Sequence, residues 1–167
     1  MSLKELVDQV GPDACRYFFL SRAANSQMDF DTQVATEKSK DNPVYYIQYA
    51  HARIVGILKN ATKLELDWSN GNVKLLNDPT ELSLIRKMLM LPDLINLIST
   101  TLEPHHLPHY ALELASSFHW FYENCRVISS HPDDFELTLS RLRLVEATQI
   151  VLARSLGLMG MSTPEIM

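Results

Sequence analysis

The sequence predicts an all-α protein, built as a bundle of four to five main helices joined by short turns. Glycine is scarce, with five among 167 residues, while leucine, alanine and glutamate are plentiful, and this balance favours helices. Apolar residues recur every three or four positions in several long stretches, as they do on one face of a helix. No stretch shows the alternation typical of a β-strand, and no internal repeat is visible. The apolar fraction of 46% is sufficient for a hydrophobic core.

The first forty residues are expected to form one short helix followed by a loop. The helix is predicted over residues 12–22, because Pro12 and Asp13 are typical of a first helical turn. The polar stretch after it, AANSQMDFD, interrupts the apolar spacing. It therefore indicates a loop or a short extended piece.

The clearest helix is predicted to begin at Pro43 and to span residues 43–65. Asn42 can accept hydrogen bonds from the free N–H groups of the first turn, and Pro43 has no N–H that needs a partner there. One face carries the apolar spacing: Val44, Ile47, His51, Ile54, Leu58 and Ala61. A different face carries Tyr46, Tyr49, Arg53 and Gly56.

The second long helix is predicted to follow a turn-rich segment and to begin at Asp78-Pro79-Thr80-Glu81. Glu81 is placed three residues after Asp78, as in a capping box. Pro92 is expected either to end this helix or to kink it near Leu91. The apolar spacing continues beyond it at Leu94, Ile95 and Ile98.

Two further helices are predicted after a connection at residues 103–106. The first begins at Leu107-Pro108, and its inward face consists of Ala111, Leu114, Ala115, Phe118, Phe121 or Tyr122, and Cys125. The last spans residues 135–156 and ends at Gly157. Its core residues are expected to be Leu137, Leu142, Val145, Ile150, Val151 and Leu152, with Arg141, Arg143 and Arg154 exposed.

The charge balance limits how this chain can bind nucleic acid. The formal net charge is -5 and the pI is about 5.6, whereas proteins that bind mainly through phosphates are usually basic. RNA binding would therefore need a local surface and stacking on unpaired bases.

The cysteines and the start of the chain favour a reducing, cytoplasmic location. Cys15 and Cys125 form no CxxC pair and are expected to be buried thiols. The N-terminus has no signal-peptide pattern, and no apolar run is long enough to span a bilayer.

The histidines do not predict a metal site. His105, His106 and His109 cluster at a helix start without a cysteine at ligand spacing, so they are interpreted as a solvated helix entry. His51 and His119 lie on or beside apolar faces and are interpreted as core or boundary residues. No catalytic motif is recognisable in the chain.

Two groups of aromatic residues allow two interpretations. Tyr45, Tyr46 and Tyr49 crowd the start of the helix at 43–65, and the second group consists of Phe118, Trp120, Phe121 and Tyr122. Composition favours packing and boundary roles. The alternative is a surface on which unpaired bases stack, each stack contributing roughly 1–3 kcal/mol.

Several strings resemble bacterial arginyl-tRNA synthetases. VGPDACRYFFLSR, MDFD and DNPVYYIQYAHARI resemble the junction and first bundle helix of that family, and FHWFYENCRVI and LGLMGMSTPEIM resemble its last helices and C-terminus. The resemblance extends from about Leu6 to Met167, and YYIQYAHAR is its most specific part.

The resemblance implies a bundle of the class I synthetase anticodon-binding type that holds the anticodon loop of tRNA(Arg). Residues 1–40 would connect it to the catalytic domain of the same parent chain, and residues 41–167 would form the anticodon-binding domain. The parent enzyme would use ATP and magnesium to attach arginine to tRNA, whereas this fragment would hold no cofactor, no metal and no catalytic residue. Glu37-Lys38-Ser39-Lys40 lacks the first lysine and the methionine of the family's ATP-binding loop. We therefore do not expect this segment to bind ATP. No contact with DNA or a membrane is implied.

The family's anticodon contacts can be transferred residue by residue. Tyr46 and Tyr49 match its tyrosine pair, and Met167 matches its terminal methionine. We add five residues on position alone: Arg53, His51, Phe118, Met161 and Arg154. Arg53 and Arg154 are expected to contact phosphates.

Two alternatives remain at this point. A helical protein-interaction module would fit the acidic charge. The anticodon domain of another class I synthetase, such as those for valine, methionine or cysteine, would share the architecture, although the STPEIM ending disfavours it.

Overall fold

The computed structural model describes residues 2–167, and within them every regular element is a helix. The helices are α1 (Leu3–Val10), α2 (Pro12–Leu20), α3 (Thr32–Thr36), α4 (Pro43–Lys63), α5 (Pro79–Leu89), α6 (Leu91–Thr101), α7 (His106–Asn124) and α8 (Phe135–Leu158), with short 3-10 turns at Val73–Leu75 and Pro132–Asp134. The predicted all-α class is confirmed. In the same residues, no helix is both long and apolar enough to cross a bilayer.

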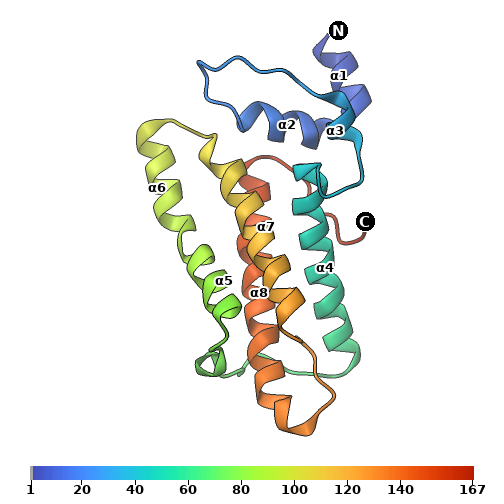
Figure 1. Ribbon diagram of the computed structural model, residues 1–167, viewed down its shortest axis with the longest axis vertical. Helices are drawn as coiled ribbons and strands as arrows, with labels where there is room; N and C mark the ends of the chain where they lie inside the picture. Colours follow the sequence, from blue (N-terminus) through green and yellow to red (C-terminus); the bar gives the residue numbers. More distant parts are fainter. Residues whose placement is uncertain (1) are drawn as a thin grey trace.

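Four helices run along the long axis of the molecule and enclose its core (Figure 1). Helices α4, α5 and α7 each contact α8, and α7 also contacts α4 and α5. The centre of the core is apolar and fully buried: Ile47, Ile54, Leu84, Leu114, Phe118, Phe121, Leu142, Leu152 and Leu156. Burial of these side chains is the main favourable term for the bundle.

The predicted start of α4 is confirmed by its cap. The Asn42 side-chain oxygen accepts from the backbone N–H of Val44 at 3.0 Å and of Tyr45 at 3.4 Å. Its amide group donates to the carbonyl oxygens of Ala35 at 3.1 Å and Glu37 at 2.9 Å. One side chain therefore both caps α4 and fixes α3 beside it.

The capping box at the start of α5 is also confirmed. Glu81, which is 1% exposed, lies against Arg141 of α8, with 2.6 Å between Oε1 and Nε. The prediction that Arg141 is exposed is wrong, because a buried carboxylate needs a partner and the Arg141 side chain is only 15% exposed. Arg143 and Arg154 are exposed, as predicted.

Pro92 ends one helix and starts another. Helix α5 stops at Leu89, and α6 begins at Leu91 with Pro92 in its first turn, where a missing N–H is tolerated. Helix α6 has no buried residue. It leans away from the bundle and contacts α5 and α7 (Figure 1).

Helices α7 and α8 differ from the predicted ones at their ends. Helix α7 begins at His106 and ends at Asn124, with Phe121 buried and Tyr122 exposed. Helix α8 continues through Gly157, and the residue with positive φ that follows it is Gly160, at 70°. The Met161 N–H bonds the Leu156 carbonyl at 2.9 Å, and such αL geometry favours glycine. Ile150 is 65% exposed, so its assignment to the core is wrong.

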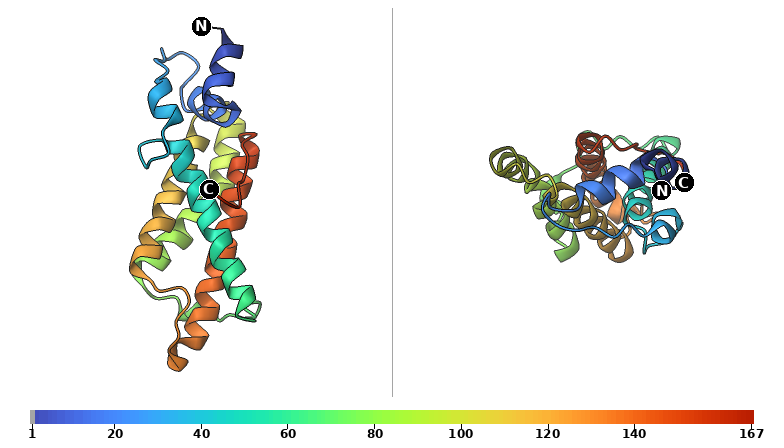
Figure 2. Two further views of the ribbon diagram at one scale, coloured as in Figure 1. Left: turned by 90° about the vertical axis from the view of Figure 1, so that its right-hand side faces the viewer. Right: turned by 90° about the horizontal axis from the view of Figure 1, so that it is seen from above.

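The segment after α8, residues 160–167, is called the C-terminal tail here. It follows the turn at Gly160 and lies beside α4 (Figure 2). The bundle thereby brings the end of the chain next to the helix that carries the tyrosines.

Residues 2–40 form a layer across one end of the bundle (Figure 1). Helix α1, which the sequence pattern did not predict, begins with a capping box between Ser2 and Glu5. Helix α2 contacts both α4 and α7. Its Tyr17 is 4% exposed, and burial raises the pKa of this phenol to about 12.

Candidate nucleic-acid interface

The partly exposed face of α4 carries three tyrosines in its first two turns. Tyr45, Tyr46 and Tyr49 are all half-buried, so none is sealed inside the bundle. Tyr45 and Tyr49 are four residues apart and therefore lie on one helix face. Their rings stack with 6.0 Å between centroids and 12° between planes.

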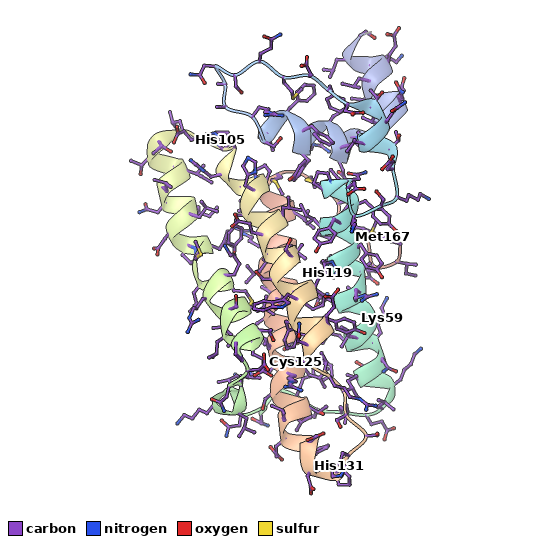
Figure 3. The ribbon with its side chains drawn as sticks, viewed as in Figure 1. Lys59, His105, His119, Cys125, His131 and Met167 are labelled. Carbon is purple, nitrogen blue, oxygen red and sulfur yellow. The ribbon has the colours of Figure 1, made fainter. Side chains whose placement is uncertain are left out.

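Tyr49 and Met167 line the same surface pocket. This pocket of about 240 Å³ is formed by Tyr49, Ala52, Arg53, Glu165, Ile166 and Met167, and we call it the Tyr49–Met167 pocket. Met167 is 48% exposed and lies beside α4 (Figure 3). The two residues matched to the family's anticodon contacts from opposite ends of the domain therefore meet in space.

The ring of Tyr46 packs against His119 of α7. The ring centroids are 4.6 Å apart for Tyr46 and His119 and 5.9 Å apart for Tyr49 and His119. His119 thus lies behind both tyrosines, between α7 and α4 (Figure 3). Tyr46 supports the surface that Tyr49 presents.

The surroundings of His119 disfavour its charged form. Burial lowers the pKa of its imidazole, and the nearby Arg53 charge lowers it further. Its Nε2 atom is buried and has no hydrogen-bond partner within residues 2–167. The His119 ring packs against both tyrosines, and burial of a charged ring there would be unfavourable.

Arg53 is engaged by two aromatic rings. Its guanidinium carbon lies 4.9 Å from the Tyr49 ring centroid and 4.8 Å from that of Tyr122. Its Nη2 donates to the Tyr49 hydroxyl at 2.5 Å. Such cation–π contacts fix the guanidinium plane. Arg53 therefore orients Tyr49, and a phosphate contact stays a prediction.

His51 and Lys59 of α4 make polar contacts with the last part of the tail. The His51 Nδ1 lies 2.9 Å from the Pro164 carbonyl oxygen. The Lys59 ammonium donates to Glu165 at 2.5 Å. This hydrogen bond and the Lys59 charge lower the pKa of the Glu165 carboxyl. The pair is exposed and carries little stability by itself, but it places the tail across the face of α4.

Three residues added on position alone lie in the interior. His51 is 4% exposed, Met161 is 5% exposed and Phe118 is fully buried. None of these three side chains is exposed enough to meet RNA without first leaving the core, and their contact with RNA stays a prediction. Arg154 is exposed on α8 but does not line the Tyr49–Met167 pocket.

Three residues that were not among the predicted site residues belong to this surface: His119, interpreted above as a core or boundary residue, Tyr122, placed above in the second aromatic group, and Lys59. His119 and Tyr122 come from α7, and Lys59 comes from α4. Tyr122 carries a detectable signal, because it lies four residues after Phe118 and stacks on it at 6.1 Å between centroids. Nothing in the local pattern predicts that Lys59 reaches the tail.

The histidines at the start of α7 divide into two groups. Glu103, His105 and His106 have ligand atoms within 4.8 Å of one another, which is a grouping that can hold a metal ion. Glu103 already lies 3.5 Å from His106, as an ordinary partly exposed ion pair does. His109 instead contacts the Ser21 carbonyl oxygen at 3.2 Å. The expectation of no metal stays a prediction.

A family comparison identifies the domain that carries the tyrosines. The family model of the DALR anticodon binding domain matches residues 47–167. The chain belongs to this family. The matched part of the DALR domain includes Tyr49, Arg53 and Met167, whereas Tyr46 and helices α1 to α3 precede it.

The relatives of this DALR domain confirm the resemblance drawn from the sequence. The chain is 57% identical over 167 residues to an arginine–tRNA ligase of Dehalococcoides mccartyi strain CBDB1, an alignment covering 100% of this chain and 30% of the relative. It is 46% identical over 170 residues to that of Symbiobacterium thermophilum, again covering 100% and 30%. The chain thus spans about 30% of the length of these relatives.

Solved structures share the fold of this DALR domain. The arginyl-tRNA synthetase of Thermus thermophilus superposes with a TM-score of 0.80 at 29% identity, covering 100% of this chain and 28% of that one. The arginyl-tRNA synthetase of Plasmodium falciparum gives a TM-score of 0.76 at 26% identity, covering 100% and 29%.

Proposed function

We propose that this chain is the anticodon-binding part of an arginine–tRNA ligase and that it binds the anticodon loop of tRNA(Arg). The observation that carries the proposal is the Tyr49–Met167 pocket, which combines a half-buried aromatic ring, a thioether and an arginine. Unpaired bases leave the stack in RNA loops and bind such surfaces by stacking.

In the proposed complex, Tyr49 stacks on a splayed anticodon base, and Met167 with Ile166 covers its other face. Tyr46 and His119 support Tyr49 from behind, at the centroid distances given above. Arg53 holds the Tyr49 ring through its hydroxyl and its face. A pre-oriented ring loses little conformational entropy when a base binds.

The local charge of α4 supports RNA binding despite the acidic chain. Helix α4 contains Arg53, Lys59 and Lys63 and no aspartate or glutamate, while the whole chain has a net charge of -5. The phosphates of a loop lying on α4 would therefore meet a locally positive helix. We keep Arg154 as a proposed phosphate contact from α8.

The remaining expectations concern the complete protein. We propose that residues 1–40 connect the catalytic domain to a class I type anticodon-binding domain at residues 41–167, and that the enzyme acts in the cytoplasm. ATP and magnesium would serve that catalytic domain. We keep as an expectation that Glu37-Lys38-Ser39-Lys40 is not an ATP-binding loop; the Ser39 hydroxyl donates to Glu37 at 3.1 Å and accepts from the Asp41 N–H at 3.2 Å.

The relatives favour this function over the two alternatives. Both named relatives are arginine–tRNA ligases, which disfavours an anticodon domain for another amino acid. A protein-interaction module is supported only by the acidic charge and by exposed apolar residues such as Leu89 and Leu102. These lie on α5 and after α6, away from the Tyr49–Met167 pocket.

The proposal is tested by Tyr49→Ala in the complete enzyme. Loss of one base stack should raise the Kd and KM for tRNA(Arg) by roughly 5- to 150-fold, which corresponds to about 1–3 kcal/mol. Steps that do not involve tRNA should be nearly unchanged. Fluorescence titration and aminoacylation kinetics measure both.

The matched control is Phe135→Ala, which removes another exposed aromatic ring (50% exposed) at the start of α8. The start of α8 lies at the opposite end of the bundle from α2 (Figure 1), and this variant should leave tRNA binding unchanged. Unaltered affinity in Tyr49→Ala, or equal binding of a tRNA with a changed middle anticodon base, would contradict the proposal.

A further inference from the structure

Three separate elements meet at a polar cluster formed by Asp13, Gln48 and Ser162. The Asp13 carboxylate, on α2, accepts from the Ser162 backbone N–H at 3.1 and 3.2 Å and from the Ser162 hydroxyl. It also accepts from the Gln48 amide of α4 at 2.8 Å. The same amide lies 3.2 Å from the Ser162 carbonyl oxygen and 3.1 Å from its hydroxyl. The cluster therefore joins α2, α4 and the tail directly.

The position of this cluster lets it fix the course of the tail. Met161, which is 5% exposed, is the last buried residue of the chain, and Ser162 is the next one. From Ser162 on, the tail has no helical hydrogen bonds of its own, so its course depends on contacts with other elements. The cluster fixes the point at which the tail leaves the core, two residues before the His51–Pro164 contact.

The hydrogen bonds of the cluster are strengthened by the charge of Asp13 and by the partial burial of Asp13 and Gln48. Gln48 is 9% exposed, and the Asp13 side chain is 21% exposed with Arg16 at 3.9 Å. A carboxylate offers about four acceptor positions, and Asp13 uses them for the N–H and O–H groups of Ser162 and for the Gln48 amide. Hydrogen bonds to charged groups are stronger than neutral ones.

We propose that Asp13 and Gln48 are positioning residues that set the geometry of the Tyr49–Met167 pocket by fixing the tail. This inference rests on the proposed function. It makes tRNA affinity depend on Asp13, a residue of the α2 layer that lies outside the pocket and outside the family match at 47–167. The connection at residues 1–40 thus contributes to anticodon binding without touching RNA.

The test compares Asp13→Ala with Asp8→Ala in the complete enzyme. Asp8 is an exposed acid on α1, so its removal controls for loss of charge from the same layer. Asp13→Ala should speed hydrogen–deuterium exchange of the Ser162 amide, which donates to the Asp13 carboxylate, and raise the KM for tRNA(Arg) about tenfold, with kcat changed little, because hydrogen bonds to a charged group are lost. Asp8→Ala should change neither quantity.

Two further variants separate positioning from general destabilisation. Ser162→Ala removes only a hydroxyl from an exposed residue and should raise KM in the same direction, even if Asp13→Ala folds poorly. Combined with Tyr49→Ala, Asp13→Ala should add little, because residues that act through one contact are not additive. A merely structural role for Asp13 would give additive effects.

The outcomes distinguish this inference from the proposed function. If exchange of the Ser162 amide is unchanged in Asp13→Ala, or if it accelerates while the KM for tRNA stays constant, the inference is wrong, although a Tyr49→Ala effect would keep the proposed function. If Tyr49→Ala also leaves KM unchanged, the proposed function itself fails.

Discussion

At the scale of single residues, the candidate site depends on how closely His119 packs against the rings of Tyr46 and Tyr49. Tyr46 and Tyr49 are three residues apart on α4, yet His119 covers Tyr46 more closely, at 4.6 Å, than Tyr49, at 5.9 Å. Tyr49 also borders the pocket that contains Met167. Tyr49 is therefore the residue whose removal should cost the most tRNA affinity.

A pH prediction belongs to His119. Its pKa is lowered from 6.5 by burial and by Arg53, so between the folded value and 6.5 the unfolded chain binds the extra proton. The contribution of His119 to the free energy of unfolding should therefore be fully present above pH 6.5. It should be lost as the pH decreases towards the pKa of His119 in the folded chain.

Urea unfolding of the native chain and of His119→Gln between pH 7.5 and about 5 checks this. The native chain should lose stability on acidification more steeply than His119→Gln, since the five other histidines contribute equally to both. Parallel pH profiles would contradict the assignment of a depressed pKa to His119.

At the scale of elements, the helix starts were predictable because their signals are local. Asn42, Pro43, Asp78 and Glu81 form the caps that their spacing predicts, since a cap is made within one helical turn. Pairing between elements was not predictable. Arg141 was expected to be exposed, because its partner Glu81 lies sixty residues away in the sequence.

A stability prediction belongs to this contact between α5 and α8. Arg141→Met should lower the free energy of unfolding by about 3 kcal/mol, because the Glu81 carboxylate is left buried without its charge partner. Denaturant unfolding measures the loss. Arg143→Met, which removes an exposed arginine bonded to the Gly71 carbonyl at 3.1 Å, should cost about 1 kcal/mol or less.

The double variant Glu81→Gln with Arg141→Met should recover most of the loss, since it removes the buried charge itself. If Arg141→Met and Arg143→Met lower the free energy of unfolding by the same amount, the Glu81–Arg141 pair stabilises the fold no more than an exposed contact does.

At the scale of the whole molecule, the layer of α1 to α3 and the bundle differ in how they are held. The bundle helices bury a continuous apolar core, whereas α1 buries only Leu6, α3 only Ala35, and α2 only Ala14, Cys15 and Tyr17. Regions with few buried contacts open locally at lower free energy. The layer should therefore open before the bundle does.

The two cysteines report on this difference. Cys15 of α2 and Cys125 at the end of α7 are 5% and 3% exposed, and burial raises the pKa of both thiols. The test uses two folded variants, each of which keeps only one of the two cysteines. Cys15 should react with a thiol reagent at least about tenfold faster than Cys125, which corresponds to a difference of about 1.4 kcal/mol in the free energy of local opening. Both should react at similar rates in denaturant. Equal rates under native conditions would show that layer and bundle open as one unit.

The sequence by itself determined the all-α class, the starts of α2, α4, α5 and α8, the family resemblance, and Tyr46, Tyr49 and Met167 as candidates, because these follow from local hydrogen bonding, apolar spacing and specific strings. The tertiary structure alone decided which candidates face outward. It buried His51, Phe118 and Met161, placed His119 behind the tyrosines, and joined Asp13, Gln48 and Ser162. These outcomes depend on packing between segments far apart in the chain, and the spacing of residues along a single helix carries no information about its partners.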